Sequence, residues 1–235
     1  MFKYSSIKQN FLDFKLKTND FHSIKGYQHL IFPCHLGIYF FGEALNSIFN
    51  RMFQKINQCF DSFFYQIINS GYIKFINQNI NSKMNLEIDR RKESKKTIII
   101  HSSNIYFNII NDIMQHQNID IGFGLTNHPI YSCCDKNNIF LFGEAHLSRK
   151  CAIVSTYNLI NESENILNIS QLNESRIIKE TIHEIGHLIL GIDHCRNSSC
   201  VMRFSKTIQK IDQKKDELCE ECKIKLRDVR TFFNF

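Results

Sequence analysis

The residues best suited to chemistry lie close together in the last quarter of the sequence. His183 and His187 are four residues apart in an apolar segment of helical length, so both imidazoles leave one face of a helix, one turn apart. That spacing allows two nitrogens to bind one zinc ion at about 2 Å. Glu184 stands where H-E-x-x-H proteins keep the carboxylate that takes a proton from water. The pattern indicates a catalytic zinc site with Glu184 as general base.

A third histidine follows this helix. Gly191 is expected to end the helix, and His194 lies just beyond it on the returning chain. Three protein ligands leave one position of a tetrahedron open for water. That arrangement is typical of a catalytic zinc site, whereas a structural site is closed by four protein ligands.

Four cysteines come directly afterwards in two pairs. Cys195 and Cys200 form a C-x4-C pattern, and Cys219 and Cys222 form C-x-x-C. Two such pairs of reduced thiols are what a closed four-thiolate zinc site needs. We therefore predict two zinc ions per chain, one catalytic and one structural.

The combined pattern H-E-x-x-H, glycine, H-C-x4-C-x-M and C-x-x-C resembles the archaemetzincins, a family of metzincin-clan zinc metallopeptidases. The resemblance covers the chain well from about Asn118 to the C-terminus. It implies Glu184 as the base and Met202 as the Met-turn residue beneath the catalytic zinc. It implies these ligands of the catalytic zinc: His183, His187 and His194. It places the structural zinc on Cys195, Cys200, Cys219 and Cys222.

The sequence departs from the metzincin pattern at one point. Three residues, 188–190, separate the second histidine from the glycine, where the pattern has two. One extra helical residue rotates the next part of the chain by about 100° and lifts it by about 1.5 Å. Counted from His187, the third ligand falls on Asp193; counted from Gly191, it falls on His194. We favour His194, because a changed turn or a π-bulge at the glycine can absorb the shift. Asp193 remains the alternative.

Alternating strands and helices, with a long helix that ends at a glycine, predict the α/β class. The resemblance implies a metzincin-like mixed twisted sheet, an active-site helix and a small C-terminal zinc-stabilised lobe. We divide the chain into an N-terminal lead-in (1–28), an α/β zinc-peptidase subdomain (29–190) and a C-terminal subdomain (191–235). The last of these carries the Met-turn and the four cysteines.

Local patterns give the expected elements of the first 190 residues. We predict helices over 43–60, 97–115 and 172–190, the last capped by Asn173 or Ser170, and strands over 30–34, 119–125, 139–142 and 152–155. Residues 67–76 and 84–88 could each supply a strand, although their periodicity is too weak to decide. In the resembled family an antiparallel edge strand lines the cleft and pairs with extended substrate, and we assign that strand to 139–142.

Composition limits the remaining possibilities. The net charge of +6 is spread over 235 residues, which argues against a surface dedicated to nucleic acid. We find no signal peptide and no apolar run long enough to span a membrane, so we expect a cytoplasmic protein that binds no membrane. In that compartment we expect the nine cysteines to be reduced thiols and metal ligands. Cys133 and Cys134 are adjacent, which is a poor geometry for binding one zinc ion together.

These observations predict a zinc metallopeptidase that acts on a peptide or protein substrate. The main alternative is a catalytically inactive, zinc-stabilised binding module, which would result if the extra residue before Gly191 displaced the third ligand. A nucleic-acid binder built on the cysteine-rich lobe is a third hypothesis, because that lobe also carries several lysines. No pattern indicates the cleavage specificity or the oligomeric state.

Overall fold

The computed structural model describes residues 30–42, 45–73, 83–90, 94–135, 137, 139–160 and 170–235, with the backbone alone over 45–46, 83–90 and 94–98. The predicted lead-in over 1–28 lies outside the described residues, so the division into three parts stays a prediction.

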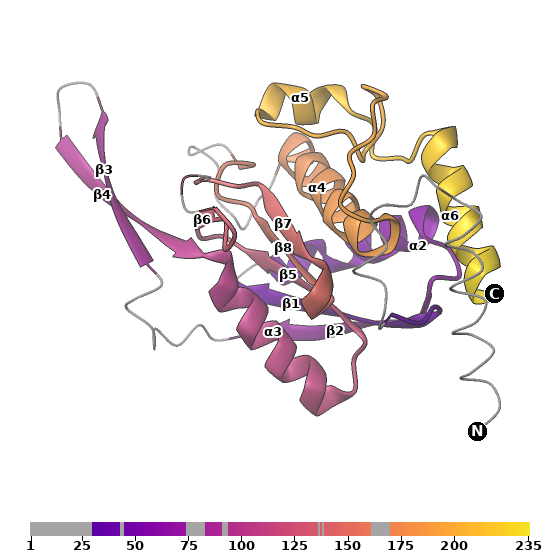
Figure 1. Cartoon of the computed structure of the whole chain (residues 1–235). Coiled ribbons are helices and arrows are strands. Elements are labelled where there is room, and N and C mark those ends of the chain that lie inside the picture. The colour runs from indigo at the N-terminus through magenta and orange to yellow at the C-terminus, as the bar shows by residue number, and fades with distance from the viewer. Residues whose placement is uncertain are drawn as a thin grey trace.

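The fold is mixed α/β, as predicted, around a five-stranded sheet (Figure 1). In spatial order its strands are β2 (Phe64–Tyr72), β1 (Cys34–Phe41), β5 (Ile121–Thr126), β8 (Cys151–Ser155) and β7 (Gly143–His146). The first four run parallel, and β7 is an antiparallel edge strand beside β8. Parallel strands are covered on both faces, which explains the near-continuous burial of β1, β5 and β8.

The first strand lies later in the chain than predicted. We expected a strand over 30–34 that ends at the proline, whereas β1 begins at Cys34, directly after Pro33. Proline has no N–H to give to a ladder, so it stands at the start of a strand more readily than inside one. The apolar residues that follow it, up to Phe41, form the ladders with β2 and β5.

A second, three-stranded sheet projects from the body of the molecule (Figure 1). It consists of β3 (Lys83–Arg90), β4 (Ser94–Ser102) and the short β6 (Ile130–Tyr131). The helix predicted over 97–115 is therefore wrong at its start, because 97–102 belongs to β4. Helix α3 (Ser103–Gln117) begins after Ser102, whose hydroxyl accepts a hydrogen bond from the Asn104 N–H at 3.3 Å.

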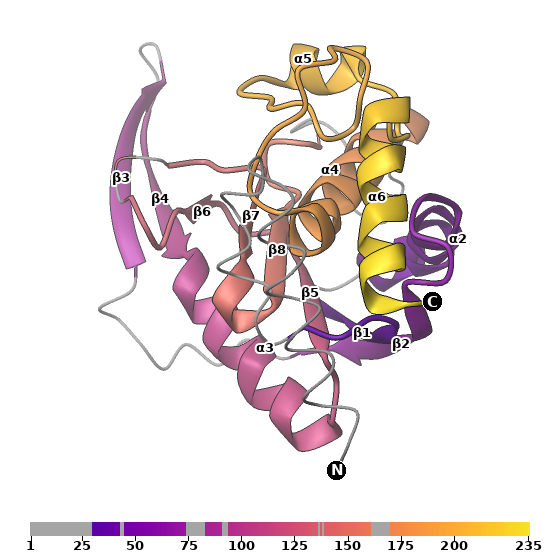
Figure 2. The ribbon, with the colours of Figure 1, turned by 45° about the vertical axis from the view of Figure 1, so that its right-hand side comes forward.

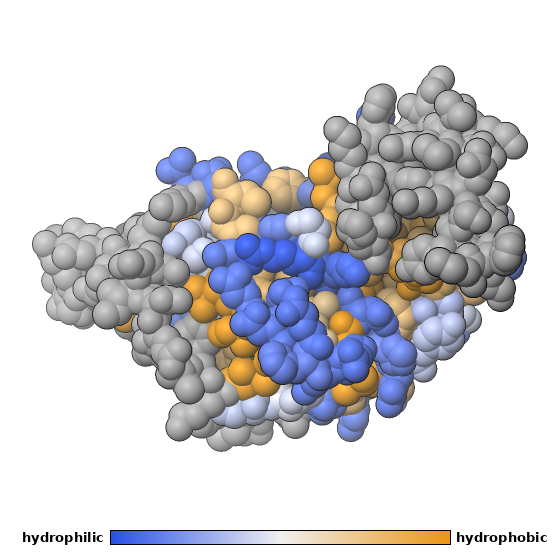
Figure 3. Space-filling view, turned by 60° about the horizontal axis from the view of Figure 1, so that its bottom comes forward, coloured by the Kyte–Doolittle hydropathy of each residue, from blue (hydrophilic) through white to orange (hydrophobic). Residues whose placement is uncertain are grey.

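Helices cover both faces of the large sheet (Figures 1 and 2). Helix α3 covers one face through a stripe of Tyr106, Phe107, Ile110 and Met114, and its outward side is mainly hydrophilic (Figure 3). The larger core lies on the other face. It packs the sheet against α2 (Phe49–Cys59, preceded by a 3-10 turn over Leu45–Ile48), α4 (Gln171–Leu190) and α6 (Glu220–Phe233).

Helix α4 is the buried centre of that larger core. Ser170 caps it, with its hydroxyl accepting from the Asn173 N–H at 3.4 Å, so Ser170 is the cap of the two predicted candidates. Polar side chains tie α4 to the segment around α5 (Ile208–Gln213). The Arg176 guanidinium holds the Asp212 carboxylate through two hydrogen bonds of 2.7 and 2.8 Å. Among the described residues, no helix combines the length and apolar character needed to cross a membrane.

Candidate active site

Helix α4 brings the first two histidines together. The Nε2 atoms of His183 and His187 are 3.1 Å apart, and both side chains are buried. Two nitrogens that each lie about 2.05 Å from one tetrahedral zinc would be about 3.3 Å apart. The pair therefore has the separation that a shared zinc ion requires.

The outer nitrogens of these rings fix the protonation of both imidazoles. The Nδ1 atom of His183 lies 2.8 Å from the Val201 carbonyl, and that of His187 lies 2.8 Å from the Gly191 carbonyl. A carbonyl only accepts, so Nδ1 carries the proton and Nε2 keeps a lone pair. Burial also lowers the pKa of His183 well below its ordinary value and that of His187 to about 4. Both rings are thus neutral near pH 7 and suited to a metal ion.

Gly191 absorbs the extra residue by its backbone conformation. It ends α4 with φ 94° and ψ 179°, in a region that favours glycine, and its N–H still donates to the His187 carbonyl. Helix α4 continues as α-helix to Leu190, directly before this turn. The chain then returns so that His194 joins His183 and His187, with ligand atoms within 4.8 Å of one another. Asp193, the alternative, is not part of this group.

Glu184 lines the same cleft as the three histidines. A Cβ placed on Gly143 of β7 would lie 2.6 Å from both Cγ and Oε1 of Glu184, so the edge strand closes directly over the carboxylate. Burial raises the pKa of Glu184 well above its ordinary range, and the Glu180 carboxylate, one turn earlier on α4, raises it further. Glu180 is itself buried and pairs with Lys214 at 2.8 Å.

Met202 packs against α4 at Gly186, the residue before His187. A Cβ on Gly186 would lie 2.3 Å from the Met202 sulfur, so only glycine allows the methionine to reach α4 at this point. Met202 is 1% exposed, and its apolar side chain forms part of the hydrophobic core next to the histidine pair.

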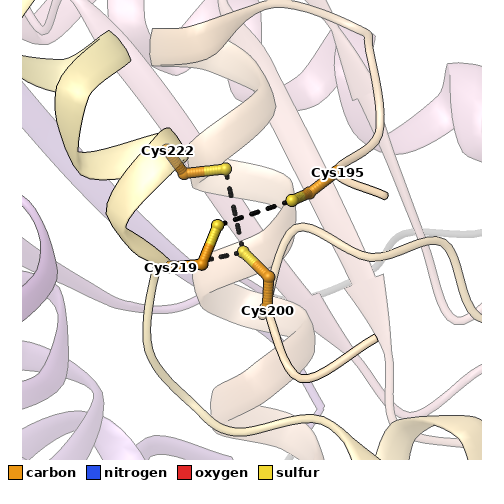
Figure 4. Close-up of side chains that lie close together, drawn as sticks. All are labelled: Cys195, Cys200, Cys219 and Cys222. Carbon is orange, nitrogen blue, oxygen red and sulfur yellow. Dashed lines mark hydrogen bonds between the residues drawn. The ribbon is translucent and has the colours of Figure 1, made fainter. Parts of the chain in front are cut away.

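The four cysteines converge as well (Figure 4). The sulfur of Cys195 is 3.6 Å from that of Cys219, and the sulfurs of Cys200 and Cys222 are 3.7 Å apart. Sulfurs at about 2.3 Å from one tetrahedral zinc would be about 3.8 Å apart. The contact between Cys200 and Cys222 lowers the pKa of Cys200 to about 5 and raises that of Cys222 well above its ordinary value. The residues present therefore fit a four-thiolate zinc site.

A cleft of about 750 Å³ opens over the three histidines. Residues 139–145 form one wall, and Ile192, Phe204 and Lys206 lie on the other side. The edge strand predicted over 139–142 lies elsewhere: it is β7, Gly143–His146. Residues 139–142 are irregular, with an isolated bridge from Ile139 to Tyr131 and a left-handed backbone at Phe140 (φ 57°).

The sequence model of peptidase family M54 matches residues 109–228, just over half of the chain. The chain belongs to peptidase family M54. The matched residues include all three histidines, Glu184, Met202 and the four cysteines.

Relatives of this M54 chain carry the name archaemetzincin. The archaemetzincin of Archaeoglobus fulgidus is 40% identical over 109 residues, which are 46% of this chain and 61% of that protein. The archaemetzincin of Methanocaldococcus jannaschii is 41% identical over 109 residues, 46% of this chain and 59% of that protein. The sequence match therefore spans about three fifths of the length of each of these relatives.

Solved archaemetzincin structures share the fold of this M54 chain over a longer stretch. The structure from Methanopyrus kandleri has a TM-score of 0.60 at 20% identity and covers 84% of this chain and 96% of its own. The structure from Archaeoglobus fulgidus, complexed with malonate, has a TM-score of 0.56 at 24% identity, with 81% and 99% covered.

Several cleft residues of this M54 chain were missed from the sequence. Glu180 stands four residues before Glu184, so helical spacing could have placed both on one face. Phe204 lies in the irregular C-terminal segment, and its ring centroid is 4.8 Å from that of His194. Lys214 lies in the same segment and pairs with Glu180, although it does not itself line the cleft. Nothing in the local sequence there indicates either contact.

Proposed function

We propose that this chain is a zinc-dependent peptidase that hydrolyses peptide bonds with Glu184 as general base. The observation that carries the proposal is the convergence of three histidine side chains beside a buried carboxylate at the floor of an open cleft. Membership of family M54 supports it, as does the fold shared with a structure from Methanocorpusculum labreanum that is described as a zinc-dependent peptidase (TM-score 0.58, 18% identity).

We propose two zinc ions per chain. His183, His187 and His194 would hold one, and the four cysteines would hold the other. A zinc ion on the histidines would polarise a substrate carbonyl and lower the pKa of water towards neutrality. Four thiolates leave no open position, so the cysteine site would serve stability alone.

The edge strand β7 would bind the substrate. It is the last strand of the large sheet, so an extended peptide can add to it as a further antiparallel strand. The irregular wall over 139–142 and the exposed rings and aliphatic groups of Phe204 and Ile192 would then contact its side chains. Such pairing would hold the scissile bond above Glu184.

Glu184 would handle the protons of the reaction. Its carboxylate would take a proton from the attacking water and pass it to the leaving amine. The close fit of Gly143 against Glu184 would keep the carboxylate in position and keep other water away. Gly186 and Met202 would support the histidine pair from below.

The decisive experiment compares Glu184→Ala with the unaltered chain. We expect both zinc ions to remain and peptide hydrolysis to fall by about 10²–10⁴-fold, the usual contribution of a general base. The matched control is Glu221→Ala, because Glu221 is an exposed carboxylate on α6 with a long 3.7 Å contact to Lys225. Retained turnover in the Glu184 variant would sink the mechanism, and turnover that survives zinc removal would overturn the zinc dependence of the proposed peptidase.

The binding-module alternative needs a displaced third ligand. His194 lies with His183 and His187, so no observation favours that alternative over the peptidase.

A further inference from the structure

A third group of side chains that can bind metal ions lies beside the edge strand. It consists of Cys133 and Cys134, in the loop after β6, and Glu144 of β7, with ligand atoms within 4.8 Å of one another. Successive side chains of a strand point to opposite faces. Gly143 faces Glu184, whereas the neighbouring Glu144 carboxylate accepts a hydrogen bond from the Ser103 hydroxyl at the start of α3; Glu144 also lines the cleft.

The two sulfurs of this group have the spacing of metal ligands. The adjacent cysteines were expected to have a poor geometry for joint binding, yet their sulfurs are 3.7 Å apart. The pairs in the four-cysteine site are 3.6 and 3.7 Å apart, and a tetrahedral zinc requires about 3.8 Å. The loop therefore holds the two sulfurs at the separation that a shared cation requires.

The Glu144 carboxylate is held in place and still has room for a cation. Its Oε2 accepts from the Ser103 hydroxyl and, at 3.3 Å, from the Cys133 N–H, while its Oε1 accepts from the Ser132 hydroxyl at 2.6 Å. A carboxylate offers about four lone-pair directions, so one on Oε1 is left. Donors of this kind orient the carboxylates that bind metal ions.

We propose that Cys133, Cys134 and Glu144 form a third zinc site, with one position open to water. Two thiolates and a carboxylate suit a borderline-soft d10 cation, and cadmium is its natural probe. A thiol that coordinates a cation loses its proton outright.

The site would connect the loop after β6 to the strand that forms the cleft wall. Glu144 is next to Gly143, which packs on Glu184. A bound cation would thus fix β7 beside the cleft. The inference does not depend on peptidase activity, because it concerns cation binding by other residues.

The test measures bound zinc per chain by equilibrium dialysis under a phosphine reductant. We expect the unaltered chain to bind one equivalent more than the Cys133→Ser/Cys134→Ser variant, and Glu144→Gln to weaken that equivalent about tenfold or more. Cys59→Ser is the matched control, because Cys59 is a partly buried thiol outside all three groups. Equal zinc content in the unaltered chain and the double variant would overturn the proposal, as would no effect of Glu144→Gln.

A second measurement needs no variant. Crystals of the unaltered chain are soaked in cadmium, and the anomalous signal is mapped. A peak between the Cys133 and Cys134 sulfurs and Glu144 Oε1 is expected in addition to peaks at the other two groups. Peaks at the histidines and the four cysteines with none at this position would refute the third site.

Discussion

The two predicted zinc sites are adjacent in the chain but differ in their ligands and in their access to the cleft. His194 and Cys195 are adjacent, yet the first completes a group of three nitrogens at an open cleft and the second a group of four sulfurs away from it. A buried carboxylate, Glu184, stands beside the histidines, whereas the cysteine group consists of sulfurs alone. Three donors leave room for water and substrate, and four donors close the coordination shell.

The difference also shows how one site depends on the other. The loop from Cys195 to Met202 is tied by the Cys195 N–H, which donates to the Met202 carbonyl at 3.0 Å. The same loop supplies the Val201 carbonyl that orients the His183 ring and the Met202 side chain that packs on Gly186. We infer that the cysteine site holds the loop in place and that the histidine site depends on the position of the loop.

The largest expected effect is on stability, from Cys200→Ser. A structural zinc contributes on the order of 10 kcal/mol in small domains, which is comparable with the whole free energy of unfolding of a domain. We expect loss of one zinc ion and a large fall in melting temperature, measured by elemental analysis and calorimetry. The histidine site should weaken as well, because Val201 and Met202 lie in the released loop.

Cys59→Ser is the control for this prediction. It removes a thiol that lies outside the cluster, so zinc content should not change. An unchanged zinc content in Cys200→Ser would show that the four cysteines do not bind zinc, and the contrast between the two sites would fail.

The next effect is on zinc affinity, from His194→Ala set against Asp193→Ala. Loss of a direct ligand should weaken zinc binding at the histidine site by about 100-fold or more, beyond the range found for outer-shell partners. The melting temperature should change little, since the four-cysteine site is intact. The zinc content should fall by one ion per chain in the His194 variant and stay unchanged in the Asp193 variant. The reverse result would make Asp193 the third ligand.

The sequence predicted those parts of the site that short-range spacing determines. The helical spacing of His183 and His187, the serine cap of α4 and the paired cysteines depend on neighbours in the chain. The position of His194 was predicted on the ground that a glycine can change a turn, and Gly191 has the backbone conformation that this needs.

The sequence did not predict features that depend on the pairing of strands. Residues 97–102 continue a helix-like apolar spacing into α3, but they pair with β3 and β6 as a strand. The apolar run at 139–142 resembles a strand and is irregular, whereas G-E-A-H at 143–146 has little strand preference and pairs with β8. In each case pairing with another strand, and not the apolar spacing of the segment itself, decided the structure.

That misplaced edge strand leads to the smallest expected effect, from Gly143→Ala. Gly143 does not have a positive φ, so alanine adds no backbone strain; its Cβ would instead lie 2.6 Å from Glu184 Cγ and Oε1 and displace the carboxylate. A shift of about 1 Å in a catalytic group can lower turnover by about 100-fold, so we expect a loss of about 10- to 100-fold with zinc content unchanged.

Gly122→Ala is the matched control, because its Cβ would meet Ile110 at 2.2 Å in the core beneath α3, far from Glu184. It should lower stability by about 1–3 kcal/mol through overpacking and leave the turnover of the folded enzyme unchanged. If both variants lost turnover only in proportion to stability, the contact between Gly143 and Glu184 would be packing alone, and the histidine site would differ from the cysteine site in its number of donors but not in a positioned base.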